Sequence, residues 1–280
     1  MGNLWSTRRT RAIHLLSQAA HAEEILTFYV ELTEAQEGVA DQVPVADWMG
    51  LVRSEESDGP NEGDLPWLRV DRLPLDGLAL PFHDFLSKTA DFGTETVKLG
   101  AQALLSQSDG EWLEPIRAAL AAWGRRAAPK EVEDFYPRAF LEPVITSVAQ
   151  ADSVQPRDWT QNFCFVCGGP PQVATIRDLP DAVGHRGLTC SMCATEWRFQ
   201  RLTCPHCGET EADKLPVHTV ESIAHVRVDA CTTCSRYIKT VDLRKKGDAV
   251  PVVDELAAVE LDIWAQEQGL TKLRANVLGL

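Results

Sequence analysis

The residues of this sequence that can do chemistry are its eight cysteines, all of which fall in CxxC pairs. The pairs are Cys164/Cys167, Cys190/Cys193, Cys204/Cys207 and Cys231/Cys234. One CxxC turn presents two sulfur atoms from a single loop, and two such turns complete the tetrahedron of thiolates that holds zinc or iron. The sequence therefore predicts two four-thiolate metal ions, iron or zinc, with all eight cysteines as ligands.

Two pairings of the CxxC turns are possible. In the sequential pairing the first turn joins the second and the third joins the fourth, with 22 and 23 residues between the turns of each site. In the nested pairing the two inner turns share one metal across ten residues, and the outer turns share the other. The near-equal gaps favour two copies of one module, and hence the sequential pairing. The segment "ATEWRF" then connects the two sites, with Trp197 and Phe199 on one side of a strand and Arg198 on the other.

A site made of four thiolates is closed, so its usual role is to hold a fold together. Iron in such a site can also change its oxidation state, which zinc cannot. Four CxxC pairs without a βαβ pattern around them do not indicate a thioredoxin-type motif. His206 and His225 would be surplus as ligands, because eight thiolates already fill two sites.

The first 150 residues read as mostly α-helical, since apolar residues recur there at helical spacing. The expected helices cover 7–40 with a break near His21, then 81–107, 111–127 and 131–150, with an acidic surface loop at 54–66. This part carries no phosphate loop, nucleophile elbow or His-Glu metal pair, so we expect no enzyme activity.

After about residue 160 the pattern changes to short strands broken by turns. The segments "EWRFQRL", "HVRVDA" and "YIKTVDL" are expected strands, and 253–269 is an expected helix closed by Gly269, with Leu256, Val259, Ile263 and Trp264 on one face. The fold class is therefore α+β. We expect a helical N-terminal domain over 1–158, a first four-cysteine module over 159–201, and a second over 202–280 that includes the C-terminal helix.

The charge of the chain bears on its partners. The formal net charge is −14, with −12 in residues 1–159 and −2 in residues 160–280. A nucleic-acid-binding protein concentrates positive charge to meet phosphates, so we expect no nucleic-acid partner.

The location of the protein is predicted from what the sequence lacks. No run approaches the roughly 20 apolar residues of a membrane helix. The segment after the arginine pair in "STRRTRA" is too short and too polar for a signal-peptide core. We expect a cytoplasmic protein without membrane insertion, in a compartment where CxxC pairs bind metals more often than they form disulfides.

The cysteine-rich half resembles the formate dehydrogenase accessory protein family, FdhE. The resemblance is carried by "CFVCGGPPQVATI", "GLTCSMCATEWRFQRLTCPHCGE", "DACTTCSRYIKTVDL" and the closing segment "DELAAVELDIWAQEQGL". It extends more weakly upstream to "RAFLEPVITSVAQ" and "FYVELTEAQ". The chain departs from the family at His21-Ala22, where a proline is expected, and in the acidic stretch at 54–66.

The resemblance implies a helper protein and not an enzyme. Its members are needed for active respiratory formate dehydrogenase and bind the catalytic subunit of that enzyme in the cytoplasm before export. The implied fold is a helical region followed by two rubredoxin-like modules, with iron associated and with the eight cysteines as ligands. Two other functions stay open at this stage: a rubredoxin-type electron carrier, and a ribbon-type nucleic-acid-binding protein, against which the acidic charge counts. The oligomeric state is not predicted.

Overall fold

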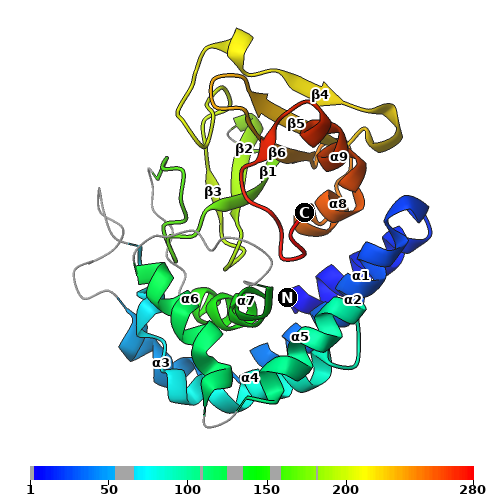
Figure 1. The fold of residues 1–280 in the computed structure, drawn as a ribbon. Coiled ribbons are helices and arrows are strands. Elements are labelled where there is room, and N and C mark those ends of the chain that lie inside the picture. Colours follow the sequence, from blue (N-terminus) through cyan, green and yellow to red (C-terminus); the bar gives the residue numbers. More distant parts are fainter. Residues whose placement is uncertain (1–2, 54–65, 108–109, 125–134, 152–158, 181) are drawn as a thin grey trace.

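The architecture was obtained as a computed structural model, which describes residues 3–53, 66–107, 110–124, 135–151, 159–180 and 182–280. A layer of helices lies on one side of the molecule and a twisted sheet on the other (Figure 1). The α+β class predicted from the sequence is confirmed, since most of the helices precede the sheet in the chain and two more follow its main strands.

The helical layer is formed by the first 150 residues, as predicted. Its α-helices are α1 (Leu4–Leu16), α2 (Glu23–Ala40), α3 (Val45–Val52), α4 (Leu75–Thr89), α5 (Glu95–Leu105), α6 (Glu114–Gly124) and α7 (Phe135–Gln150). Short 3-10 turns cover Ala20–Ala22, Val70–Arg72 and Glu111–Leu113. The expected break near His21 is one of these turns. The acidic stretch at 54–65 and residues 125–134, at the expected ends of two helices, lie outside the described residues.

The single helix expected over 81–107 is wrong. The chain forms α4, which begins earlier at Leu75, and then α5. Helix α4 ends at Thr89, with Ala90 as its C-cap. Gly93, in the connection to α5, adopts a left-handed φ of +85°, and the side chain of Thr94 caps α5 by accepting from the backbone N–H of Val97. The apolar stripe continued across this junction, so periodicity alone did not show it.

Helix α7 is the central element of the helical layer. Twelve of its residues are buried, on all sides of the helix. A helix that is buried all round must have neighbours on every side, and α7 packs against α2, α4 and α6. Its one buried carboxylate, Glu142, is paired with Arg8 of α1 at 2.6 Å. The ion pair and the apolar contacts together fix α1 and α2 against α7.

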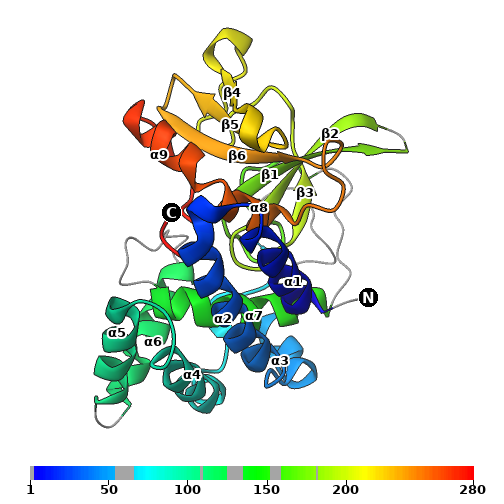
Figure 2. The same cartoon turned by 90° about the vertical axis from the view of Figure 1, so that its right-hand side faces the viewer.

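The second half of the chain forms one continuous sheet (Figure 2). Its strands are β1 (Pro171–Leu179), β2 (Ala182–Cys190), β3 (Glu196–Arg198), β4 (Val217–Thr219), β5 (Val226–Cys231), β6 (Arg236–Asp242) and β7 (Thr271–Lys272). The order is β3-β2-β1-β6-β5-β4, with β7 beside β6. The three expected strand segments correspond to β3, β5 and β6, whereas β1 and β2 were not predicted.

The two cysteine modules are joined by the pairing of β1 with β6. These strands run parallel, with Val173 opposite Lys239 and Ile176 opposite Asp242. Within the first module β1 pairs antiparallel with β2, and within the second module β5 pairs antiparallel with β6. The two modules therefore share one sheet. Their apolar residues also pack together, since Ile238 of the second module belongs to the cluster around the first cysteine group and Val173 of the first module packs with Val226 and Val228 of the second.

The single C-terminal helix expected over 253–269 is also wrong in detail. It is divided into α8 (Pro251–Ala257) and α9 (Val259–Glu267) by Ala258, whose ψ of 37° is not helical. Helix α8 packs between the sheet and helices α1 and α2, while α9 packs on β5 and β7. Because the two halves meet different surfaces, Ile263 is 55% exposed instead of sharing the buried face. Gly269, with φ +75°, ends the helical segment as predicted.

Helix α8 is one of the contacts between the two layers (Figure 2). Its Asp254 accepts hydrogen bonds from Arg11 of α1 at 2.9 and 2.6 Å and lies 2.9 Å from His225. Its Glu255 is fully buried and pairs with Lys239 at 2.8 Å and with Lys272 at 2.9 Å. Burial opposes the charge on Glu255, but these two ammonium groups lower its pKa to about 2. The layers are thus held together by satisfied buried charges as well as apolar contacts.

Among the described residues, every helix is too short or too polar to cross a lipid bilayer.

Candidate metal centres

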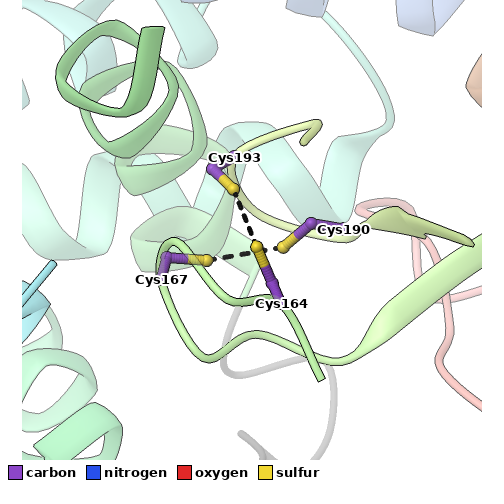
Figure 3. Close-up of side chains that lie close together, drawn as sticks. All are labelled: Cys164, Cys167, Cys190 and Cys193. Atoms are coloured by element: carbon purple, nitrogen blue, oxygen red, sulfur yellow. Dashed lines mark hydrogen bonds between the residues drawn. The ribbon is translucent and has the colours of Figure 1, made fainter. Parts of the chain in front are cut away.

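The first cysteine group brings together the thiols of Cys164, Cys167, Cys190 and Cys193 (Figure 3). The Sγ atoms of Cys164 and Cys193 are 3.5 Å apart, and those of Cys167 and Cys190 are 3.4 Å apart. All four lie within 4.8 Å of one another. A tetrahedron with metal–sulfur bonds of about 2.3 Å has sulfur–sulfur edges of about 3.8 Å. The donors present therefore fit one tetrahedral thiophilic ion, and they are too far apart for disulfides.

Two tight turns build this group. In the first, Gly168 N–H donates to the carbonyl of Cys164 at 2.8 Å, and Gly168 adopts φ +76°. In the second, Cys190 N–H donates to the carbonyl of Thr195 at 2.9 Å, and Ala194 takes a left-handed φ of 56°.

Backbone N–H groups also point at the sulfur atoms of the first group. Val166 N–H donates to Cys164 Sγ and Met192 N–H to Cys190 Sγ, both at 3.4 Å. Such hydrogen bonds stabilise negative charge on sulfur, as metal thiolates require.

The first group is buried inside the main hydrophobic core. Its four cysteines are at most 2% exposed. The hydroxyl of Thr146 on α7 donates to the carbonyl of Met192 at 3.2 Å, which ties the second turn to the helical layer. On the other side, Leu68 N–H donates to the carbonyl of Val166 at 2.7 Å. Both turns are therefore held by the N-terminal helical region.

The ionisation of the first group depends on its burial. Burial raises the pKa of Cys164 and Cys167 well above the ordinary cysteine value. Burial also opposes ionisation of Cys193, but hydrogen bonds from the neighbouring thiols lower its pKa well below that value. Four thiolates at these distances repel one another and need a cation to offset their charge.

The second group gathers Cys204, Cys207, Cys231 and Cys234 at the end of β5. The Sγ atoms of Cys204 and Cys234 are 3.8 Å apart, and those of Cys207 and Cys231 are 3.7 Å apart. These distances match the edges of a metal–thiolate tetrahedron. Cys204 and Cys231 are buried, whereas Cys207 is exposed and Cys234 half-buried, so one side of this group lies at the surface.

Polar contacts lie beside the second group. The carboxylate of Glu209 accepts from the hydroxyl of Thr233 at 2.6 Å and from the backbone N–H of Thr210 and Glu211 at 3.0 Å. The hydrogen bond from Thr233 is the main reason that the pKa of Glu209 falls to about 2. This carboxylate links the turn after Cys207 to the β5–β6 turn.

The sequential pairing predicted from the spacing is confirmed by both groups, and the nested pairing is wrong. Trp197 and Phe199 are buried and Arg198 is exposed, as predicted for the connecting segment. The ring of His206 is not among the four donors; only its backbone N–H contacts Cys204 Sγ, and His225 contacts Asp254 instead. Thr146 and Glu209 were not predicted, because neither lies at a spacing that signals its distant partner.

Fold and donor sets together define a class of protein: an α+β chain whose helical region packs against a sheet that contains two four-cysteine modules. Within this class, residues 163–201 match the profile of the FdhE central domain, and residues 202–278 match that of the FdhE C-terminal domain. A protein FdhE homolog of Aquifex aeolicus is 32% identical over 214 residues, 76% of this chain and 74% of that protein. The chain belongs to the FdhE family, the accessory proteins of formate dehydrogenase.

Two further comparisons extend over nearly the whole chain. A protein FdhE homolog of Stutzerimonas stutzeri is 27% identical over 278 residues, 99% of this chain and 89% of that protein. The crystal structure of the FdhE protein from Pseudomonas aeruginosa matches with a TM-score of 0.72 at 22% identity, covering 98% of this chain and 95% of that one. At this identity the structural match establishes the shared fold.

Proposed function

We propose that this chain is a cytoplasmic maturation factor that binds the catalytic subunit of formate dehydrogenase and is required for the activity of that enzyme. The observation that carries the proposal is the closed nature of both cysteine groups in a chain of the FdhE family. When four thiolates of the protein fill a tetrahedral site, no position is left for a substrate. The metal then serves to hold a surface in shape, which suits a protein that docks onto another.

The ligand assignment is part of the proposal. Cys164, Cys167, Cys190 and Cys193 would hold one ion, and Cys204, Cys207, Cys231 and Cys234 the other. Both iron and zinc accept four thiolates, so the donors fit either metal. The corresponding division of the chain is a helical region at 1–158, a first module at 159–201 and a second at 202–280.

Deletion of the gene in the native host tests the requirement for activity. Formate dehydrogenase protein should be present but poorly active in the deletion strain. Activity should return with the intact chain and not with the Cys190→Ser/Cys193→Ser double variant. Full formate-oxidising activity in the deletion strain, with no second copy of the family, would show that the maturation hypothesis is wrong.

Binding to the catalytic subunit requires a separate test. The tagged chain is purified from the native host, and the proteins retained with it are identified, together with the metals that the chain contains. The catalytic subunit should be retained in a defined ratio to the chain. Its absence, in cells that express it, would contradict the docking step.

A rubredoxin-type electron carrier is the second candidate, and the exposure of Cys207 favours it, because electron exchange requires a metal centre near the surface. Iron at the second group with a reversible visible spectrum would support this function. Zinc at that group would exclude it, since zinc has no accessible second oxidation state.

A further inference from the structure

A cavity of about 210 Å³ lies between the two modules, beside the second cysteine group. Arg227 and Asp229 of β5 line it. They alternate along the strand with Val226 and Val228, which belong to the core beneath α9. Side chains that alternate along a strand point to opposite faces, so the cavity is on the face of the sheet that α8 and α9 leave uncovered.

The charged lining of this cavity is mainly cationic. Four arginines and one carboxylate line it: Arg186, Arg201, Arg227, Arg236 and Asp229. Asp229 lies 2.8 Å from Arg227 and 3.5 Å from Arg186, so this single carboxylate is shared by two guanidinium groups. Within the described part of the chain, Arg201 and Arg236 make no ion pair. The lining therefore has a net charge of +3.

The neighbouring cysteine group offsets part of this charge. Cys204 and Cys231 line the cavity too, and a divalent ion on four thiolates carries a net charge of −2. One positive charge is left over, or two if the ion is trivalent. Arg186 is 4% exposed and donates to the carbonyls of Gln200 and Thr203, so its position is fixed before any ligand arrives. The cavity is thus a preformed cationic site.

The apolar lining indicates the kind of anion. Leu202 is 62% exposed and Val217 is 50% exposed, and both line the cavity with the more buried Leu215 and Ile238. A free inorganic anion would leave these side chains in water, whereas a carboxylate beside an apolar residue of a peptide covers them. The volume is below the roughly 300 Å³ at which small-molecule pockets begin, and suits a single side chain. Val217 also belongs to β4, one of the two end strands in the order of the described sheet, where an extended peptide can pair.

We propose that this cavity binds an acidic segment of a partner polypeptide, in which an Asp or Glu carboxylate meets Arg201 and Arg236 and an apolar neighbour covers Leu202 and Val217. The proposal rests on the proposed function only for the identity of the partner.

Direct binding is measured by fluorescence anisotropy with the full chain. The probe is a fluorescein-labelled peptide of alternating leucine and glutamate, compared with its leucine–glutamine analogue and with inorganic phosphate as a competitor. The glutamate peptide should bind, and the Arg201→Gln/Arg236→Gln variant should bind it at least about tenfold more weakly, because a hydrogen bond to a charged group is worth that much. Equal binding of the glutamine analogue, or displacement by phosphate at the same concentration as by unlabelled peptide, would overturn the proposal.

Two further variants separate the loss of peptide binding from a loss of metal at the second cysteine group. Val217→Glu places a carboxylate at the mouth of the cavity, away from the cysteine turns, and should weaken binding to a similar degree with both metals retained. The matched control is Arg117→Gln/Arg198→Gln, which removes two charges from exposed arginines that do not line the cavity and should bind as the unchanged chain does. If the Arg201→Gln/Arg236→Gln variant loses metal and Val217→Glu binds normally, the arginines only balance the metal centre and the proposal is wrong.

Co-purification connects the cavity with the partner. If the unchanged chain retains formate dehydrogenase and Val217→Glu does not, the cavity is the docking site. If both retain it equally, the cavity proposal fails and the proposed function stands. If neither retains it but the peptide binds, the cavity proposal stands and the docking step of the proposed function fails.

Discussion

The two cysteine groups have the same donors and nearly the same geometry, yet they lie in different surroundings. The first is surrounded by the main core, with Phe165, Met192 and Trp197 packed beside it. The second lies at the surface, where the exposed Cys207 and the hydrogen-bonded Glu209 replace apolar neighbours. The burial of the first group means that losing its metal disturbs both layers of the fold. If the second group holds a metal, its loss should remain local, because the group lies outside the main core.

Removal of ligands from the first group should have the largest effect. Cys190→Ser/Cys193→Ser leaves two thiolates and places two hydroxyl groups in an apolar site. We expect the free energy of unfolding to fall by more than about 4 kcal/mol, because metal binding and folding are coupled. Metal analysis should show one ion per chain instead of two, and thermal unfolding should show the loss of stability. A variant that melts at the same temperature would remove the distinction between the two groups.

Removal of a ligand from the second group should have a smaller and local effect. In Cys231→Ser the turns at 204–209 and 231–235 lose their common metal. Strands β5 and β6 still pair with each other, and β6 still pairs with β1. Hydrogen exchange should increase in these turns and the connection up to β4, with little change in α7. Increased exchange throughout α7 would show that the second group is not local.

The two groups should also release metal at different rates. A chelator reaches Cys207 directly, whereas the first group is at most 2% exposed and opens only when the core opens. We expect release in two phases that differ at least about tenfold, equivalent to about 1.4 kcal/mol in the barrier. Cys231→Ser should remove the fast phase. Release of both metals in a single phase would contradict the comparison.

The smallest effect is expected at Thr146, which connects α7 to the first group. Thr146→Val removes the hydroxyl that donates to the carbonyl of Met192 and keeps the shape of the side chain. The free energy of unfolding should fall by about 1 kcal/mol, as for other buried hydrogen bonds. Chemical denaturation measures this, and Thr33→Val, whose hydroxyl bonds only within its own helix, is the matched control. An equal or greater loss of free energy of unfolding in the control would show that the hydrogen bond to Met192 adds no stability beyond that of a bond within one helix.

The sequence predicted the cysteine groups better than the fold around them. Ligand pairing could be predicted because the spacing repeats within a short part of the chain. The break between α4 and α5, which the prediction of a helix over 81–107 missed, was readable from Gly93 and Thr94, a turn residue followed by a helix cap. The break at Ala258 was not, because alanine favours helices and only the two different surfaces met by α8 and α9 explain it.

The common sheet was the main feature that the sequence did not reveal. It depends on the parallel pairing of β1 with β6, which are far apart in the chain and carry no local signal for each other. Thr146 and Met192 likewise meet only in the folded protein. Contacts of this kind follow from the packing of whole layers, and the residue patterns of either segment alone do not contain them.

The ion pair between Arg11 and Asp254 has a consequence for synthesis on the ribosome. Arg8 finds Glu142 once α7 has been made, but the carboxylate that pairs with Arg11 follows it by 243 residues. At about 5–20 residues per second, translation takes on the order of ten to fifty seconds to supply it. During that time the surface of α1 and α2 that α8 later covers remains open to other proteins. The nascent chain is therefore exposed to unwanted association with other proteins until α8 has been made and packs against α1 and α2.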